Sequence, residues 1–254
     1  MTARRMDGRV AIVTGAAQGM GVTHARRLVA EGGCVVLADI ADEKVEALQQ
    51  RLGERTMAVR LDVTDEASWA AAVDATRGRW GRVDALINNA GLLERGDVDS
   101  TPRHVWDKIL AVNMTGVYLG MAAVLPMMKL QRAGSIINIS SVDGIRGTDH
   151  LFAYTASKWG VTGMTKAAAV EVAPWNIRVN SVHPGLIRSP MAEALGPTRL
   201  AIPLDRGAEP EEVSAMVAFL ASDESAYCTG AEFVIDGGLT AGIPHRDPPP
   251  IRRS

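Results

Sequence analysis

Short runs of apolar and β-branched residues alternate along the chain with longer stretches in which apolar positions follow a helical spacing. The runs cover residues 10–14, 34–39, 57–63, 84–91, 135–141, 177–185 and 232–238. Such runs are typical of buried strands, and strands separated by helices pair in parallel because each helix carries the chain back across the sheet. The pattern therefore predicts an α/β fold, a doubly wound parallel sheet of seven strands with helices on both faces. Ligands of such sheets bind beyond the carboxyl ends of the strands.

The hydrophobic pattern continues without a linker or an internal repeat. We therefore expect a single domain over residues 1–254, with a core from about residue 6 to residue 240. Composition changes only in the tail, residues 242–254, where prolines and arginines argue against regular structure. This tail is either a mobile end or an arm that docks on a neighbouring subunit.

Composition and charge argue against several classes of partner. With 47% hydrophobic residues, the chain can bury a substantial core. A net charge of -2 and a pI near 6.2 give no reason to expect nucleic acid or an anionic membrane as partner. Cys34 and Cys228 lie far apart and are most simply buried thiols of a reducing compartment. We expect neither a signal peptide nor a membrane span, and hence a cytoplasmic protein with a small ligand.

Glycines gather at the first turn from strand to helix, in the stretch TGAAQGMG. Glycine lets the backbone curl tightly and approach a ligand, while the helix N-terminus offers unpaired N–H groups and a positive dipole end to a pyrophosphate. The spacing alone also fits a turn that merely packs well. With the strand ends below, it predicts a dinucleotide site that begins with Gly15, Gln18, Gly19, Met20 and Gly21.

Asp39 ends the second predicted strand, 18 residues beyond Gly21, and is followed by Ile40. An acidic side chain there can accept hydrogen bonds from both ribose hydroxyls of an adenosine, whereas a 2'-phosphate would meet a carboxylate. Gln18 supplies no positive charge to compensate, so the sequence favours NAD over NADP. Asp39 could instead cap the next helix, but Asp42 already fits that position.

The third and fourth strands end in residues that fit the rest of a dinucleotide. Asp62 can accept from the adenine amino group with Val63 beside the ring, although an Asp that opens a local turn is an equal alternative. The small residues of NNAG let a cofactor pass over the backbone and add Asn89, Ala90 and Gly91 to the predicted site.

Tyr154 and Lys158 stand four residues apart in YTASK, within a helical pattern. Four residues make about one helical turn, so the two side chains share a face. A tyrosine ionises near pH 10, and an ammonium about 4 Å away supplies about 4 kcal/mol, which would lower that pKa by about three units. The pair suits acid–base chemistry near neutral pH, although by itself it also fits an ordinary surface helix.

In their order and spacing, TGAAQGMG, Asp39, NNAG, Asn113, ISS, YTASK and HPG resemble the short-chain dehydrogenase/reductase family. The resemblance covers roughly residues 6–240 and implies a Rossmann fold and a nicotinamide cofactor. The stretches RVNSVHPG and ASDESAYCTGAEFVIDGG further resemble 3α,20β-hydroxysteroid dehydrogenases of actinobacterial type.

The resemblance implies catalytic roles for four residues. The family's tyrosine donates or accepts a proton, its lysine holds the nicotinamide ribose, and a serine 13 residues before the tyrosine binds the substrate oxygen. That serine corresponds to Ser141 rather than Ser140, since strand alternation sends the two side chains to opposite sides. The family's asparagine would hold a water that links the lysine to solvent. The implied set is Asn113, Ser141, Tyr154 and Lys158.

The stretch HPGLIRSPM after the sixth strand is similar to the family segment that clasps the nicotinamide carboxamide. Pro184 and Gly185 make the turn, and the family's backbone amide and threonine correspond to Ile187 and Ser189. The serine keeps the hydroxyl but lacks the methyl group. His183 precedes the turn and is more simply structural than a general base.

The predicted substrate pocket is hydrophobic. Residues 191–205 mix Leu, Met and Ile with Gly and Pro without a firm period, as a mobile lid over an apolar ligand would. Other strand ends contribute Leu92, Leu93, Val142, Ile145, Leu151 and Phe152, with Glu94, Asp143 and His150 as polar candidates at the rim.

These observations lead to one functional hypothesis and two alternatives. The hypothesis is an NAD(H)-dependent oxidoreductase that interconverts a secondary alcohol and a ketone, without a metal, on hydroxysteroids or other bulky hydrophobic ketones. An NADPH-dependent 3-oxoacyl-thioester (carrier protein) reductase is disfavoured by Asp39 and Gln18. A non-catalytic nucleotide-sensing or scaffold protein is disfavoured by Tyr154 and Lys158, which such relatives usually lose. The resemblance also implies a homotetramer built from helix-paired dimers.

Overall fold

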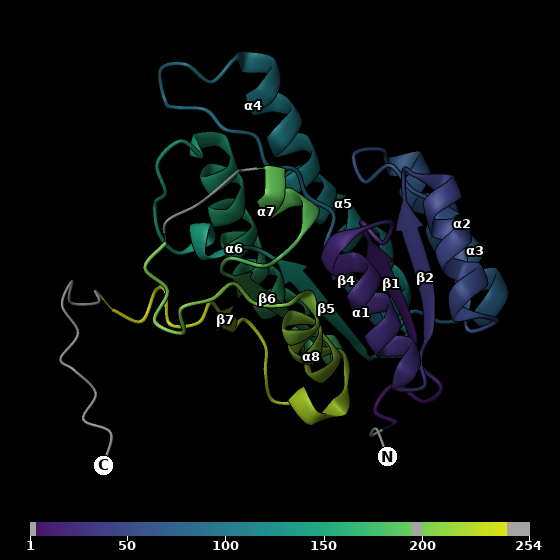
Figure 1. The fold of residues 1–254 in the computed structure, drawn as a ribbon. Coiled ribbons are helices and arrows are strands. Elements are labelled where there is room, and N and C mark those ends of the chain that lie inside the picture. The colour runs from purple at the N-terminus through teal and green to yellow at the C-terminus, as the bar shows by residue number, and fades with distance from the viewer. Residues whose placement is uncertain (1–3, 195–199, 243–254) are drawn as a thin grey trace, which may run out of the picture.

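The computed structural model describes residues 4–194 and 200–242. Seven parallel strands form one sheet in the order β3-β2-β1-β4-β5-β6-β7 (Figure 1). They are β1 Val10–Thr14, β2 Cys34–Asp39, β3 Thr56–Arg60, β4 Ala85–Asn88, β5 Gly134–Ile139, β6 Ile177–Pro184 and β7 Glu232–Ile235. The predicted seven-stranded parallel sheet is confirmed. Of the predicted lid, residues 195–199 lie outside the described residues, and so does the predicted tail from residue 243 onward.

Helices connect the strands and cover both faces of the sheet. They are α1 Gly19–Ala30, α2 Asp42–Leu52, α3 Glu66–Trp80, α4 Arg103–Leu110, α5 Gly116–Gln131, α6 Phe152–Val172, α7 Pro190–Ala194 and α8 Pro210–Ala221. A π-helical turn, η1 (Ala111–Thr115), joins α4 to α5, and short 3₁₀ turns form η2 (Val142–Gly144), η3 (Ala173–Trp175) and η4 (Asp223–Ser225).

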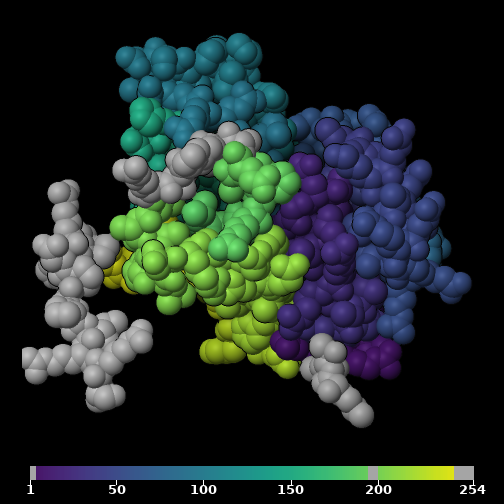
Figure 2. Space-filling model, in the orientation of Figure 1, coloured from purple at the N-terminus to yellow at the C-terminus, as the bar shows by residue number. Residues whose placement is uncertain are grey.

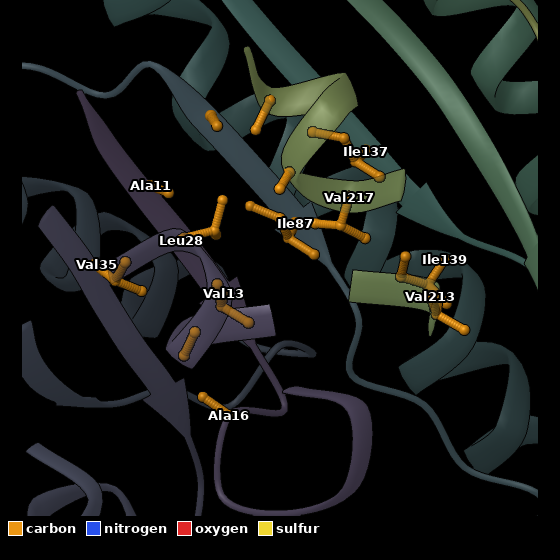
Figure 3. Close-up of a cluster of buried hydrophobic side chains, with 14 of the residues drawn as sticks. Ala11, Val13, Ala16, Leu28, Val35, Ile87, Ile137, Ile139, Val213 and Val217 are labelled. Atoms are coloured by element: carbon orange, nitrogen blue, oxygen red, sulfur yellow. The ribbon is translucent and has the colours of Figure 1, made fainter. Parts of the chain in front are cut away.

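Strand alternation divides the core into two layers. Val13 of β1 faces the layer under α1, α2 and α8 together with Leu28 and Val217 (Figure 3). Its neighbour Ile12 points the other way, into the layer under α3, α5 and α6, with Trp69. Both faces are apolar because parallel strands are buried on both sides, and this explains why the strands appear in the sequence as continuous hydrophobic runs.

Local signals set several helix ends. Asp65 precedes α3 and accepts hydrogen bonds from the main-chain N–H groups of Ala67 and Ser68, both at 3.1 Å, which satisfies free donors of the first turn. Gly81 ends the same helix in the left-handed region, with φ of 72°. The N-cap of α2 is Ala41, not Asp42, so the expectation that Asp42 caps this helix is wrong.

One helical segment has the length and composition of a membrane span, which was not expected from the sequence. Residues Arg103–Gln131, which comprise α4, η1 and α5, form a segment that is long and apolar enough to cross a membrane by length and composition. In the fold this segment packs against the sheet and its neighbours. Asn88 of β4 donates to the carbonyl of Val117 at 3.4 Å, and a Cβ at Gly120 would lie 2.7 Å from the Trp69 ring. Its hydrophobicity therefore serves the core of this fold.

A buried histidine makes the stability of the fold sensitive to acid. His24 of α1 is fully buried, and its Nδ1 lies 2.8 Å from the Ser214 hydroxyl of α8. Burial lowers the pKa of His24 from 6.5 to about 3. Because the unfolded chain protonates this ring near pH 6.5, its contribution to stability is full above that pH and is lost as the pH falls towards 3.

We expect the free energy of unfolding to fall by about 1.4 kcal/mol for each pH unit below about 6.5 on account of His24. Denaturant titrations at about pH 6.5 and about pH 5.5 would measure this dependence. His24→Gln keeps an amide donor but cannot titrate, so its pH dependence should be weaker by about that amount. Identical pH dependences of wild type and variant would contradict the assignment.

Candidate active site

The glycine turn after β1 is packed too closely for side chains. A Cβ on Gly21 would lie 2.0 Å from the carbonyl oxygen of Gly15, and a Cβ on Gly15 would lie 2.9 Å from Cα of Ala90. Gly15 and Gly19 also have φ values of 65° and 56°, in the left-handed region. The side chain of Asn89 adds to this close packing and donates a hydrogen bond to the carbonyl of Gly15 at 3.3 Å.

The N-terminus of α1 is open towards a ligand. Its N-cap, Gln18, makes no side-chain capping bond, and the first turn has no acidic residue. The first N–H groups of a helix lack partners within the helix and carry the positive end of its dipole. Together with the close glycine packing, this end of α1 fits a pyrophosphate group.

Asp39 ends β2 beside this turn, but its carboxylate has local partners that the sequence did not indicate. One oxygen accepts from the N–H of Ala17 at 3.0 Å, and the other accepts from the N–H of Ala41 at 3.0 Å. Asp39 therefore links the glycine turn to the start of α2. Each carboxylate oxygen keeps a further lone pair that can accept from a ribose hydroxyl.

A cavity of about 530 Å³ runs along these strand ends. Of the predicted cofactor residues, it is lined by Gly15, Gln18, Gly19, Met20, Asp39, Ile40, Asp62, Val63, Asn89, Ala90, Gly91 and Ser189. Gly21 lies behind the turn. The sequence does not predict three residues of this lining. They reach the cavity because α4 continues into the π turn, and they are Lys108, Ala111 and Val112. No motif marks them.

Asp62 shows the local turn that the sequence allowed. Its carboxylate accepts from the Thr64 hydroxyl at 2.7 Å and from the Thr64 N–H at 2.9 Å. These hydrogen bonds lower the pKa of Asp62. The residue nevertheless lines the cavity, so the turn and a ligand contact are compatible.

A second cavity, of about 380 Å³, adjoins the first. Met20, Ser189 and Met191 line both. In Figure 2 the segment around α7, in green, lies against the purple N-terminal segment, in agreement with contacts of about 4.0 Å from a Cβ at Gly19 to Ser189 and Pro190. Pro184, Gly185 and Ile187 line the second cavity rather than the first.

Tyr154 and Lys158 lie on one face of α6, as their spacing predicts. Both are buried, and the Lys158 ammonium lies 5.5 Å from the centre of the Tyr154 ring. Lys158 Nζ donates to the carbonyl of Ile139 at the end of β5, at 2.8 Å. Tyr154 lines the second cavity, while a Cβ at Gly91, in the wall of the first, would lie 3.7 Å from Lys158 Nζ. Lys158 lines neither cavity, but its ammonium lies close behind the Gly91 backbone of the first one.

Burial has the largest effect on the pKa values of this pair. Burial raises the pKa of the Tyr154 phenol well above its usual value, a hydrogen bond with Ser141 lowers it, and the negative charge of Asp143 raises it again. Burial lowers the pKa of Lys158 to about 8, against a smaller effect of Asp143 in the other direction. Desolvation therefore dominates the pKa of Tyr154 in this structure, and the lowering of this pKa by Lys158 together with a bound nicotinamide ring stays a prediction.

The two consecutive serines after β5 have different surroundings. Ser140 donates to the carbonyl of Lys158 at 3.0 Å and lies 3.3 Å from the Thr162 hydroxyl, so it fastens α6 to the sheet. The Ser141 hydroxyl instead hydrogen-bonds Tyr154 and lies 3.4 Å from Asp143 Oδ2. Of the two serines, Ser141 therefore has its hydroxyl beside the phenol.

Asn113 lies in the π turn and is fully buried. Its amide oxygen accepts from the N–H of Leu92 at 2.7 Å, and its amide nitrogen donates to the carbonyl of Leu92 at 2.8 Å and to Ser157 at 3.1 Å. The side chain thus ties the segment after β4 to α6. These bonds explain why a polar residue occupies an apolar helix; the expected water path stays a prediction.

His183 supports Ser141 from behind. Its Nδ1 lies 2.8 Å from the Ser141 carbonyl oxygen and must donate, so Nε2 is the acceptor for the Ser181 hydroxyl, also at 2.8 Å. Burial lowers the pKa of His183, which keeps the ring neutral. His183 is buried and does not line the second cavity.

The second cavity is less apolar than the sequence predicts. Leu93, Val142 and Leu151 line it, but Leu92 lines the first cavity, and Ile145 and Phe152 line neither. The Phe152 ring packs instead against Trp106, with centroids 5.6 Å apart. Glu94 pairs with Lys108 at 2.7 Å and lines neither of the two cavities. Polar residues of the loop after β5 form one side, namely Asp143, Arg146, Thr148 and His150.

Comparisons with known proteins agree with this geometry. A short-chain dehydrogenase/reductase family model described as enoyl-(acyl carrier protein) reductase matches residues 15–240. The chain is 49% identical over 243 residues to a 3-alpha-(or 20-beta)-hydroxysteroid dehydrogenase of Mycobacterium tuberculosis, covering 96% of this chain and 94% of that protein. It is 46% identical to a trans-4-hydroxycyclohexanecarboxylate dehydrogenase of Sinomonas cyclohexanicum, covering 94% and 95%.

Among solved structures, a 3-ketoacyl-(acyl-carrier-protein) reductase from Brucella melitensis complexed with NADH superposes with a TM-score of 0.89 at 33% identity, covering 92% of this chain and 99% of that one. The chain belongs to the short-chain dehydrogenase/reductase family. It is an oxidoreductase of alcohols and ketones that uses a nicotinamide cofactor.

The close packing of the glycine turn leads to a test by substitution. Gly21→Ala forces its Cβ against the Gly15 carbonyl, 2.0 Å away. Overpacking costs about 1–3 kcal/mol, so stability should fall by that amount and affinity for the nicotinamide dinucleotide should fall about tenfold or more. Fluorescence titration with the reduced cofactor measures the second effect.

Gly78→Ala is the matched control for Gly21→Ala. Gly78 lies in α3, and no atom lies within 4 Å of a Cβ added there. An alanine at this helical position should raise stability by about 0.5–1 kcal/mol and leave cofactor affinity unchanged. Equal cofactor affinities of the two variants would show that the turn does not form the pyrophosphate site.

Proposed function

We propose that this chain is an NAD(H)-dependent oxidoreductase that interconverts a secondary alcohol and a ketone, with Tyr154 as proton donor and acceptor. The observation that supports the proposal is the position of Tyr154 in the wall of the second of two adjoining cavities, with the Lys158 ammonium close behind Gly91 of the first. One cavity begins at the glycine turn and reaches Asp39, and the other contains the Ser141 hydroxyl beside the phenol.

The roles of the residues follow from their positions. A bound nicotinamide supplies or accepts a hydride at the carbon of the reacting C–O group. Ser141 donates a hydrogen bond to the substrate oxygen and stabilises the negative charge that builds there more in the transition state than in the ketone. Tyr154 delivers a proton to that oxygen in reduction and removes it in oxidation. Lys158, held by the Ile139 carbonyl, binds the nicotinamide ribose and keeps a positive charge near the phenol.

The remaining predicted residues complete the cofactor site in this proposal. Asn113 fixes the segment after β4 over Lys158 and holds the water of a proton path. The nicotinamide end of the cofactor faces residues that line the second cavity, one of which also lines the first. They are Pro184, Gly185, Ile187 and, in both cavities, Ser189. Asp39 binds the adenosine ribose through its free lone pairs.

Bulky hydrophobic ketones and alcohols, hydroxysteroids among them, are the substrates that we infer. The names of the two similar enzymes support a cyclic secondary alcohol. The cavity of about 380 Å³ falls in the range that encloses such a molecule. A panel of steroids and smaller cyclic ketones, followed by NADH absorbance, would identify the class.

Reduction of a 3-oxoacyl thioester on a carrier protein is the second candidate. The structural likeness to the 3-ketoacyl-(acyl-carrier-protein) reductase from Brucella melitensis favours it. The presence of both Tyr154 and Lys158 disfavours the alternative of a non-catalytic nucleotide sensor. The substrate panel separates the two catalytic candidates when it includes a 3-oxoacyl thioester.

We further propose a cytoplasmic homotetramer. Tyr118 of α5 and Trp159 and Val170 of α6 are exposed apolar side chains on the two helices that would pair subunits. Large exposed apolar residues on a helical face favour burial against a second copy.

Removal of the phenol hydroxyl tests the catalytic assignment. Tyr154→Phe should lower kcat about 10²- to 10⁴-fold, because general acid–base catalysis is lost, while NADH binding stays nearly unchanged. Tyr227→Phe, at a fully exposed tyrosine, is the control and should behave as wild type. Undiminished turnover of Tyr154→Phe would disprove the role of this residue.

Asp39 leads to a test of cofactor choice. Initial rates should be at least about tenfold higher with NADH than with NADPH, since a 2'-phosphate would meet the carboxylate. Asp39→Ser should narrow this ratio of rates, because the variant removes the negative charge that repels a 2'-phosphate. A wild-type preference for NADPH would overturn the assignment of the cofactor.

A further inference from the structure

Asp143 carries a carboxylate that no step of the proposed reaction uses, although it lies beside the reacting groups. It belongs to the 3₁₀ turn η2, two residues after Ser141, and is 7% exposed. It lines the same cavity as Tyr154. A buried carboxylate is costly unless its oxygens have partners, so its contacts indicate what it does.

Three side chains approach the Asp143 carboxylate. The Thr148 hydroxyl donates to Oδ1, and Arg146 Nε lies 3.8 Å from the same oxygen. The Ser141 hydroxyl donates to Oδ2 at 3.4 Å, and the Asp143 N–H donates back to the Ser141 oxygen at 3.0 Å. Ser141 and Asp143 therefore fix each other's geometry.

The Ser141 hydroxyl has one proton and two acceptors within reach. Asp143 is one, at a long distance, and the Tyr154 oxygen is the other. A hydrogen bond of 3.4 Å is weak, so its exchange for a bond to a substrate oxygen costs little. The carboxylate can thus hold the hydroxyl in place until a substrate oxygen accepts the hydrogen bond instead.

The charge of Asp143 also acts on the catalytic pair. It raises the pKa of Tyr154, in addition to the larger effect of burial, and raises the pKa of Lys158, against the effect of burial. Solvent screens such interactions weakly in a buried site. The carboxylate therefore opposes the phenolate and favours the ammonium.

We propose that Asp143 is a positioning residue of this active site: its carboxylate orients the Ser141 hydroxyl in the wall of the cavity that Tyr154 also lines. This proposal rests on the proposed function. Its consequence is that ketone reduction persists to higher pH, and alcohol oxidation begins at higher pH, than in a site without this charge.

The two directions depend on Tyr154 in opposite ways. In reduction a hydride from NADH forms the new C–H bond, and the carbonyl oxygen takes the phenol proton, which leaves NAD⁺, alcohol and phenolate. In oxidation the phenolate removes the hydroxyl proton while the hydride leaves to NAD⁺. A charge that favours the phenol thus shifts the pH limits of both directions upwards.

Other charged and titratable groups surround Asp143. Tyr154 and Lys158 face it from α6, and His183 of β6 contacts it only through the main chain of Ser141. The remaining groups around the same cavity are Arg95, Arg146, Asp149 and His150.

The experiment compares pH profiles of kcat in both directions for wild type and Asp143→Asn. The amide keeps the shape and removes the charge. We expect the acid limb of alcohol oxidation and the alkaline limb of ketone reduction both to move to lower pH by about one unit, with NADH affinity unchanged. Unmoved limbs would overturn the proposal. Asp143→Ala serves the same purpose if the amide variant does not fold.

Asp97→Asn is the matched control for loss of one charge. Asp97 is half exposed, pairs with His150 and does not line the cavity. We expect the acid limb of alcohol oxidation and the alkaline limb of ketone reduction to lie at the same pH in this variant as in wild type. An equal shift in both variants would show a general effect of net charge and would also overturn the proposal.

A readout without turnover separates this proposal from the proposed function. Tyrosinate absorbance at alkaline pH, corrected with Tyr154→Phe for the other two tyrosines, reports ionisation of Tyr154 directly. More tyrosinate in Asp143→Asn than in wild type at one pH supports the role of Asp143 even if no tested ketone is reduced. Equal ionisation overturns it, whatever the substrate.

Discussion

The site depends on a lysine ammonium held in the interior of the protein. Lys158 is 4% exposed, and a buried charge is stable only with polar partners. The Ile139 carbonyl at the end of β5 accepts a hydrogen bond from the Lys158 ammonium at 2.8 Å. Burial lowers the pKa of Lys158 to about 8, so the ammonium persists at neutral pH but loses its proton at a lower pH than an exposed lysine does.

Three connections keep this lysine in position. Ser140 donates to the Lys158 main chain, Asn113 donates to Ser157, and His183 fixes the carbonyl of Ser141. Each joins α6, or the turn before it, to a different strand end or to the π turn. The polar residues at this edge of the sheet thus form one connected support, in which every hydrogen bond restricts the catalytic helix.

The same burial makes the phenol a poor acid by itself. Desolvation raises the pKa of Tyr154, and a hydrogen bond with the Ser141 hydroxyl lowers it. Asp143 acts in the opposite direction. The balance of these groups, rather than any single one, determines the pH at which proton transfer takes place.

Local rules made much of this protein predictable. The seven apolar runs specified the parallel sheet, because buried strands have no polar face, and the strand ends then had to meet at one edge. The glycine turn, Asp39 and the four-residue spacing of Tyr154 and Lys158 also followed from sequence. By contrast, the partners of Asp39, the cap of α2 and the polar side of the second cavity did not. The bond from Ala17 to Asp39 joins residues 22 positions apart, for which spacing carries no signal, while the cap of α2 and the polar wall of the cavity depend on backbone conformation that the residue pattern does not specify.

The sequence by itself determined which residues could reach the edge of the sheet. The period of the hydrophobic positions and the succession of strands and helices along the chain are local properties that can be read from it. Only the tertiary structure decided the energetics of these residues. The burial of Tyr154 and Lys158 arises from the packing of α6 against β5 and β6, and burial sets the sign of both pKa shifts. Desolvation depends on every atom that surrounds a group, and that surrounding exists only once the chain has folded.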